Sequence, residues 1–194
     1  MEQVVVGSRS SVVGFRIAAL VGGAVLVAAA AQIAVPLPGT PVPMTLQPIA
    51  VLLVGGLLGA RFGALSMILY LAMGAAGLPV FTPTVPLFGI ARLLGPTGGY
   101  LLAYPVATWA VGALVSSGRG PGVGLPWVGR VASGVLAGLV LIHLGGLAQL
   151  AIITGSIAGA AQLATWPFLL GDLLKIAVLV PVLTQLTPTI RARV

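Results

Sequence analysis

Long apolar runs alternate with short segments rich in proline and glycine along the whole chain. A helix needs about 20 apolar residues to cross a hydrocarbon core of roughly 30 Å. The runs are continuous, whereas a barrel strand would alternate apolar and polar positions. They predict six spans, near residues 14–35, 47–60, 62–79, 98–117, 128–154 and 165–187. We therefore expect an all-α, polytopic membrane protein, a six-transmembrane-helix bundle in which residues 1–194 form a single integral membrane domain.

The segments between the spans differ in character. Residues 36–48 contain five prolines and residues 78–99 contain four, so neither segment can form a regular helix. We name these segments the first lid (residues 36–48) and the second lid (residues 78–99). Between the second and third spans, the sequence Gly59-Ala60-Arg61-Phe62-Gly63 instead predicts a tight turn.

Composition narrows the class of protein. Only 6% of the 194 residues are charged, whereas a soluble domain averages about 25%, which excludes a soluble globular enzyme. Cysteine is absent, so there is no thiolate metal site, and we predict neither a metal nor a cofactor. The formal net charge is +7. The arginines stand singly between apolar runs, which is typical of topology signals and lipid contacts and not of nucleic-acid binding.

The distribution of arginine orients the bundle. Six spans place both termini on one side of the membrane, and the opposite side then holds only Arg92. Because cytoplasmic loops carry the excess of positive charge, we expect both termini in the cytoplasm and both lids outside. The arginines on the cytoplasmic side are then Arg9, Arg16, Arg61, Arg119, Arg130, Arg191 and Arg193.

The N-terminal run has a second interpretation. Arg9 and Arg16, the apolar run and Ala28-Ala29-Ala30 together resemble a signal peptide with its cleavage site. The run from Ile17 to Val35 is long enough to span a membrane, which favours a retained helix.

Asp172 and Lys175 are the most informative residues. They stand at positions i and i+3 of the last span and so share one helix face. Each ionised group inside a span costs roughly 2.5–3.5 kcal/mol, and such residues mark functional sites by default. Measured from Trp166, which we take as an interfacial anchor, both residues lie in the outer half of the membrane, under the lids. The alternative is an ion pair that merely neutralises itself.

Other polar residues fall at the same level. Thr45 and Gln47 stand where the first lid enters the second span, Tyr100 and Tyr104 begin the fourth span, and Arg92 lies in the second lid. An anionic ligand group would find Arg92 there, in a partly desolvated setting that strengthens a charge-assisted hydrogen bond. The alternatives are an interfacial aromatic belt for the tyrosines and a solvated loop position for Arg92.

Several catalytic arrangements are missing. Lys175 is the only lysine, so the chain has no P-loop, and any ATP-driven work must come from a partner. His143 is the only histidine, no second metal ligand stands at a useful spacing, and we expect it far from Asp172 in depth. We therefore interpret His143 as a satisfied core residue, and the chain as a protein without catalytic residues.

Small residues recur at helical spacing in the first span. Ala18 and Gly22, and likewise Ala19 and Gly23, are four residues apart, which lets helix backbones approach closely. We predict that these four residues dock onto another membrane subunit. The alternative is packing inside the bundle.

Four motifs occur in a specific order and spacing, over residues 43–47 (Pro-Met-Thr-Leu-Gln), 77–81 (Gly-Leu-Pro-Val-Phe), 94–101 (Leu-Gly-Pro-Thr-Gly-Gly-Tyr-Leu) and 171–175 (Gly-Asp-Leu-Leu-Lys). Together they resemble the BioY family, the biotin-binding S components of energy-coupling factor (ECF) transporters. The resemblance implies the six-helix ECF S-component fold, biotin capture from outside and a place in the prokaryotic cytoplasmic membrane. It also implies partners: a transmembrane coupling subunit, which the small residues of the first helix would contact, and two ATPase subunits.

The same resemblance implies that Asp172 and Lys175 contact biotin and that the first lid, around Thr45 and Gln47, closes over it. Chemistry agrees, because biotin's ureido ring offers two N–H donors and one carbonyl acceptor to a carboxylate and an ammonium. Its tail ends in a carboxylate, for which Arg92 is the outward cation. The competing hypothesis is a stand-alone secondary or proton-coupled carrier with Asp172 as its proton site.

Overall fold

The computed structural model describes residues 7–116 and 125–191, so Arg119 and Arg193 lie outside the described residues. The described chain is mostly helical. Five helical stretches are long and apolar enough to cross a membrane, namely Val13–Ala31, Gln47–Ala75, Gly98–Ser116, Pro126–Thr154 and Ile157–Arg191. This confirms a polytopic helical protein, and the second stretch contains the break described below.

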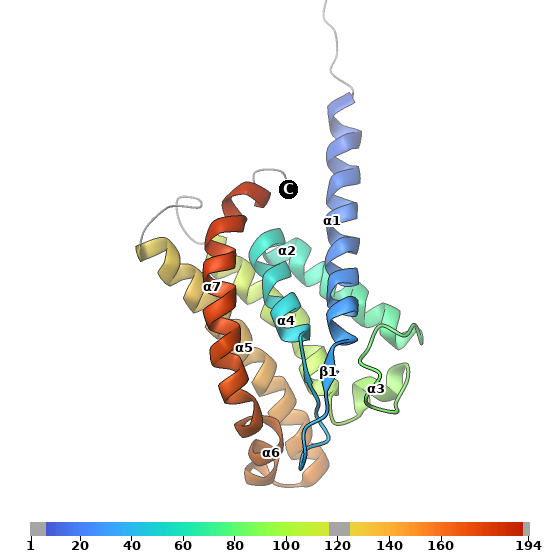
Figure 1. Cartoon of the computed structure of the whole chain (residues 1–194). Coiled ribbons are helices and arrows are strands. Elements are labelled where there is room, and N and C mark those ends of the chain that lie inside the picture. The colour runs from blue at the N-terminus through green and yellow to red at the C-terminus, as the bar shows by residue number, and fades with distance from the viewer. Residues whose placement is uncertain (1–6, 117–124, 192–194) are drawn as a thin grey trace, which may run out of the picture.

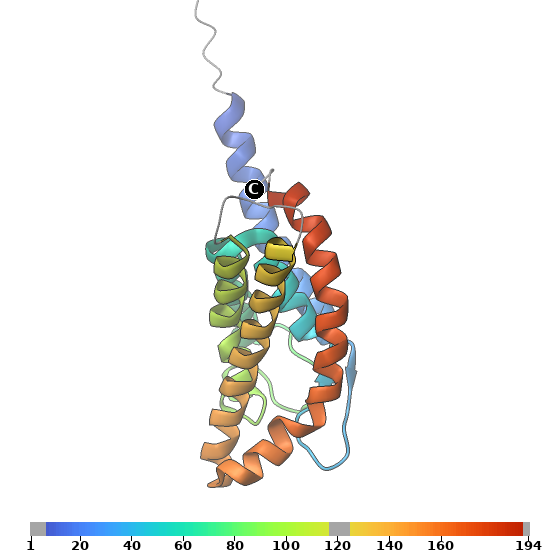
Figure 2. The ribbon, with the colours of Figure 1, turned by 90° about the vertical axis from the view of Figure 1, so that its left-hand side faces the viewer.

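The long helices pack side by side in one bundle (Figures 1 and 2). Helix α4 (Gly98–Ser116) lies between α2 (Gln47–Ala75) and α5 (Leu125–Thr154), while α7 (Leu169–Arg191) packs against α2 and α5. Helix α1 (Gly7–Ala31) packs against α2 by one face and leaves the other exposed. The start of α1 and the end of α7 lie at the same end of the bundle, and both lids lie at the other (Figure 1).

Helix α2 is divided at Gly59, whose φ of 80° and ψ of 177° are not helical. A Cβ added to Gly63 would lie only 3.2 Å from the Cα of Gly55, although eight residues of straight helix span about 12 Å. The chain therefore folds back on itself at Gly59, and α2 consists of two arms. A positive φ of this kind favours glycine. The predicted tight turn at residues 59–63 is confirmed.

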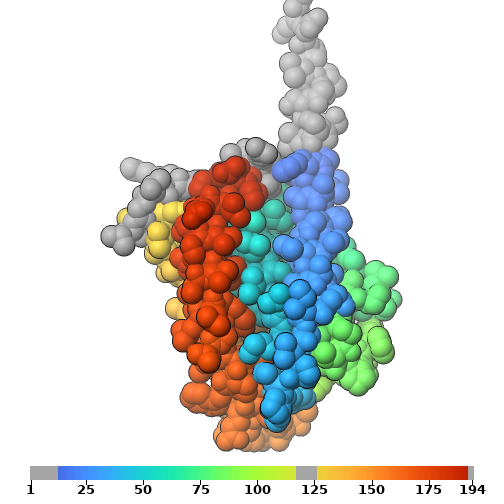
Figure 3. All heavy atoms as spheres, viewed as in Figure 1, coloured from blue at the N-terminus to red at the C-terminus, as the bar shows by residue number. Residues whose placement is uncertain are grey.

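Neither lid forms a long helix, as predicted. In and next to the first lid, two short strands, β1 (Ala34–Val35) and β2 (Met44–Thr45), pair antiparallel, and the second lid contains the short helix α3 (Ile90–Leu94). The hydroxyl of Thr40 in the first lid donates to the carbonyl of Leu163 at 2.8 Å. In Figure 3 the first lid lies between the orange spheres of α6 and the green spheres of the second lid.

Two short helices between α5 and α7 were not predicted. Helix α6 (Ile157–Ala164) starts at Ser156, whose Oγ accepts from the backbone N–H of Gly159 at 3.1 Å, and the 3-10 helix η1 (Trp166–Phe168) follows. Helix α6 turns back along α5 (Figure 2). The chain therefore re-enters the bundle before α7 begins, and α7 starts at Leu169 instead of the expected 165.

Candidate functional site

A cavity lies under both lids, between α4, α5 and α7. All six residues predicted to bind substrate line it: Thr45, Gln47, Arg92, Tyr100, Asp172 and Lys175. The empty space between the lining residues is about 600 Å³, which includes the open solvent at its mouth. The structure thus brings the predicted residues together, and their contact with a ligand stays a prediction.

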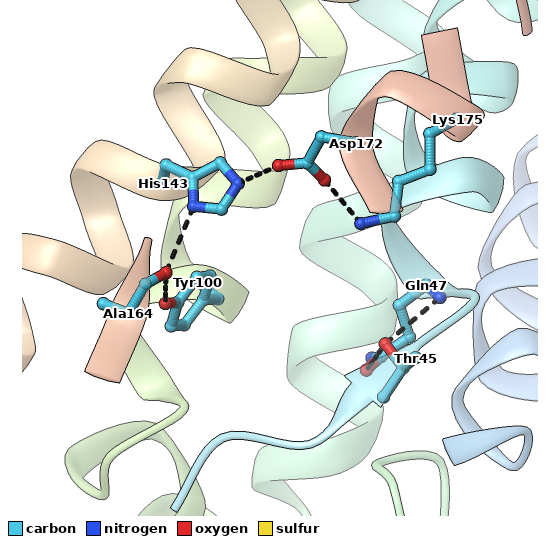
Figure 4. Close-up of polar contacts among 7 residues, drawn as sticks. All are labelled: Thr45, Gln47, Tyr100, His143, Ala164, Asp172 and Lys175. Atoms are coloured by element: carbon cyan, nitrogen blue, oxygen red, sulfur yellow. Dashed lines mark hydrogen bonds and ion pairs between the residues drawn. The ribbon is translucent and has the colours of Figure 1, made fainter. Parts of the chain in front are cut away.

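Asp172 is the centre of the polar cluster in this cavity (Figure 4). Its Oδ1 accepts from Lys175 Nζ at 2.6 Å, and its Oδ2 lies 2.5 Å from His143 Nε2. Asp172 and Lys175 are each only 7% exposed. The lipid-facing side of the same helix carries Leu170, Leu173 and Leu174, which are strongly exposed in the isolated chain. Helix α7 therefore turns its charged face inward, toward the cavity.

The expectation that His143 lies far from Asp172 is wrong. It placed Trp166 at the membrane surface and counted depth from there. Helix α6 instead carries the chain back along α5, so that the carbonyl of Ala164 lies 3.3 Å from His143 Nδ1. Asp172 stands in the first turn of α7 and consequently lies at the level of the middle of α5, beside His143. One sequence signal pointed this way: the fifth apolar run, residues 128–154, is longer than one crossing needs.

Aromatic rings form one wall of the cavity. The rings of Tyr100, His143 and Phe168 stand 6.2–6.3 Å apart, centroid to centroid, and the Tyr100 hydroxyl donates to the Ala164 carbonyl at 2.5 Å. A Cβ at Gly146 would overlap the ring of Tyr100, so glycine is required there for α5 to accept this ring. Tyr100 is 8% exposed and faces the cavity, which rules out the interfacial-belt alternative.

Arg92 is buried, so the solvated-loop alternative is also wrong. It is 1% exposed, its Nη1 donates to the Val85 carbonyl at 2.6 Å and its Nη2 to the Thr82 carbonyl at 3.1 Å. Its Nε is buried and has no hydrogen-bond partner among the residues that the structure describes. Burial lowers the pKa of the guanidinium from its ordinary value, but arginine remains charged at neutral pH. Within residues 7–116 and 125–191 no carboxylate pairs with Arg92, which therefore brings an unneutralised cation to the cavity.

Gln47 connects the two lids. Thr45 Oγ1 donates to Gln47 Oε1 at 3.2 Å, and Gln47 Nε2 donates to the Tyr70 hydroxyl at 2.7 Å. The Tyr70 hydroxyl in turn donates to the carbonyl of Val80, in the second lid, at 3.2 Å. This chain of hydrogen bonds fixes the two sides of the cavity mouth relative to each other.

The four predicted docking residues of α1 do not share one environment. Ala18 and Gly22 are exposed, and no atom of the described residues lies within 4 Å of a Cβ added to Gly22. Ala19 is half-buried. Gly23 is buried, and a Cβ there would meet Ser66 Oγ at 2.8 Å. The prediction that Gly23 docks onto another subunit is therefore wrong, because its lack of a side chain lets α1 pack on α2. The exposed residues remain candidates for docking.

Comparison with known proteins places this site in context. Residues 8–192 match the model of the BioY family. The chain is 40% identical over 146 residues to the probable biotin transporter BioY of Pyrococcus horikoshii, covering 75% of this chain and 81% of that protein. It is 36% identical over 153 residues to the biotin transporter BioY of Thermotoga maritima, covering 79% and 84%.

A solved structure shares the fold. The crystal structure of the S-component for biotin from an ECF-type ABC transporter superposes with a TM-score of 0.72. That superposition covers 96% of this chain and 94% of the other, at 23% sequence identity.

Proposed function

This chain belongs to the BioY family, and on that premise we propose that it is a biotin-binding S component that mediates biotin uptake as part of an ECF-type transporter. The observation that carries the proposal is the buried Asp172–Lys175 pair, which faces a cavity under two irregular lids. Burying a charged side chain is costly in free energy unless the charge is paired. Binding of a polar ligand by these two side chains explains why they are retained inside a span.

The polar cluster has free hydrogen-bonding capacity for the ureido ring. Each oxygen of Asp172 has one partner among the described residues, while an ionised carboxylate has about four acceptor positions. Lys175 can donate three hydrogen bonds, and one goes to Asp172. The two N–H groups of the ring can therefore bind Asp172, and its carbonyl can bind Lys175.

The other end of biotin carries a carboxylate, and Arg92 suits it. The guanidinium lines the same cavity, and in the described part of the chain it bonds only to backbone carbonyls and leaves its Nε unpaired. A carboxylate would neutralise this charge through strong, charge-assisted hydrogen bonds. The proposed ligand thus lies with its ring toward α7 and its tail toward the second lid, while Thr45, Gln47 and Tyr100 line its sides.

In the membrane, the two arms of α2 count as separate crossings, which makes six spans with both termini in the cytoplasm and both lids outside. The chain itself would need no cofactor and catalyse no reaction. A coupling subunit and two ATPase subunits would supply the energy, with the exposed Ala18 and Gly22 on the docking face of α1.

Two measurements test this proposal. Purified protein is titrated with biotin by calorimetry, and the double variant Asp172→Asn/Lys175→Met is compared with Leu174→Met, which changes an exposed residue of the same helix. We expect binding in the wild type and in Leu174→Met and its loss in the double variant. Equal affinity in all three would overturn the site.

The source of energy is tested by uptake into proteoliposomes. We expect biotin uptake only when the coupling and ATPase subunits are present with ATP. Uptake that follows a pH gradient without those partners would instead support the stand-alone, proton-coupled carrier.

A further inference from the structure

We propose that His143 is a positioning residue for ligand recognition: it holds the Asp172 carboxylate in the orientation that receives the ligand's ring N–H groups. This inference rests on the proposed biotin site. It begins with the contact between His143 Nε2 and Asp172 Oδ2, at 2.5 Å. Lys175 holds the other oxygen at 2.6 Å. The carboxylate is therefore clamped between α5 and α7, and it cannot rotate without losing a charge-assisted hydrogen bond.

The surroundings of the ring define its protonation. Asp172 is an acceptor, so His143 must carry a proton on Nε2. Nδ1 lies 3.3 Å from the Ala164 carbonyl oxygen, which also accepts a hydrogen bond from Tyr100 at 2.5 Å. The contact between Nε2 and Asp172 is the shorter of the two ring contacts, and the geometry assigns Nε2 as the donor to the carboxylate.

His143 also lies between two cavities of the protein. Together with Leu139 and Asp172 it lines both the ligand cavity and an apolar groove between α5 and α7. A much smaller side chain would connect the cavity with the groove, so an alanine variant would mix two effects. The informative variants are those of similar size, in which only the donor to Asp172 changes.

Three substitutions separate the donor from the shape. In His143→Gln the side-chain amide can reach the place of Nε2 and donate to Asp172, whereas in His143→Phe the shape is kept and the donor is lost. Leu144→Met, at an exposed neighbouring position, is the control for repacking of α5. We expect His143→Phe to lower biotin affinity about tenfold or more and His143→Gln to restore most of it.

Analogues show which end of the ligand depends on His143. Biotin and biotinamide should lose the same factor in His143→Phe, because the tail does not contact Asp172. Biotin methylated at a ureido nitrogen should bind wild type weakly, and His143→Phe should discriminate less between it and biotin. If His143→Phe binds biotin as the wild type does, or if His143→Gln is no better than His143→Phe, the positioning role is wrong, while wild-type biotin binding would leave the proposed function intact.

The tautomer is measured directly, because the chain contains a single histidine. Protein purified through a histidine-free tag and labelled with ¹⁵N-histidine gives one pair of ring nitrogen signals. We expect a proton on Nε2, and a change of both signals in Asp172→Asn. A proton on Nδ1 alone would overturn the proposal, whether or not biotin binds.

Discussion

The two ends of α7 hold charged side chains in different ways. At its outer end Asp172 and Lys175 face a cavity, and their remaining hydrogen-bonding capacity is free for a ligand. At its inner end Arg191 is instead held by backbone carbonyls and one hydroxyl. Its Nε donates to the Gly56 carbonyl at 2.9 Å, its Nη1 donates to the Ser116 hydroxyl, and its Nη2 bonds to the carbonyls of Gly55 and Gly112 at 3.4 Å.

The inner arrangement follows from the broken helix. The fold-back at Gly59 ends the first arm of α2, and the carbonyls at a helix end lack partners within the helix. Arg191 satisfies those of Gly55 and Gly56. The comparison shows that a charged side chain indicates ligand binding where it lies beside a cavity and its protein partners leave some of its hydrogen-bonding positions free. A charged side chain whose hydrogen bonds are all taken up by backbone groups indicates helix packing instead.

The largest expected effect is a loss of biotin affinity when the charged pair at the outer end of α7 is disrupted. In Asp172→Asn the carboxylate is lost and Lys175 remains buried without its counter-ion, so biotin affinity should fall about 100-fold. Calorimetric titration of the purified variant measures this. The matched change at the inner end, Arg191→Gln, should leave the dissociation constant per folded molecule unchanged. Similar losses of affinity in both variants would contradict the distinction between the two ends.

The second prediction concerns the contacts of Arg191 at the inner end of α7. Arg191→Met removes the donors to three backbone carbonyls, which should lower the free energy of unfolding by about 2–3 kcal/mol. Thermal unfolding in detergent, with and without biotin, measures the loss. The biotin concentration that saturates the wild type should still raise the unfolding temperature of Arg191→Met, and it should raise that of Asp172→Asn much less. A variant as stable as the wild type would show that Arg191 is not a packing residue.

The third prediction sharpens the account of the outer end by separating ring from tail. Arg92→Gln should weaken biotin binding about tenfold, since a charged hydrogen bond is lost. The same variant should bind biotinamide, which has no carboxylate, as well as the wild type does. Competition binding with both ligands makes the comparison. An equal loss for the two ligands would place the carboxylate away from Arg92.

The smallest expected effect concerns the first lid. Thr40→Val removes the hydroxyl that donates to the Leu163 carbonyl, and a neutral hydrogen bond contributes about 1 kcal/mol. Biotin should therefore dissociate about fivefold faster, as measured by displacement with excess unlabelled ligand. Thr40→Ser keeps the hydroxyl and should dissociate like the wild type. An unchanged rate in Thr40→Val would mean that this contact does not hold the lid.

Local patterns in the sequence predicted much of this structure. Prolines marked both lids, glycines marked the turn at residues 59–63, and the i, i+3 spacing placed Asp172 and Lys175 on one face. Their convergence with Arg92 and Gln47 was inferred from common depth alone. Each of these signals depends on a few neighbouring residues, which is why the sequence carries them.

Features that depend on the path of the chain were missed. His143 was assigned to the core because helix α6 was not expected to return along α5 and bring Ala164 to its side. Gly23 has the same spacing as Gly22, and only the position of Ser66 on α2 shows which of the two is buried. Periodicity gives the faces of a helix, but it does not say what packs against each face.

A crystal structure of the protein with bound biotin tests the central claim most directly. The account predicts that the ureido nitrogens lie about 2.7–3.2 Å from the oxygens of Asp172, with the ring carbonyl beside Lys175 and the tail carboxylate beside Arg92. Biotin bound in the apolar groove between α5 and α7, or with its ring away from Asp172, would contradict it.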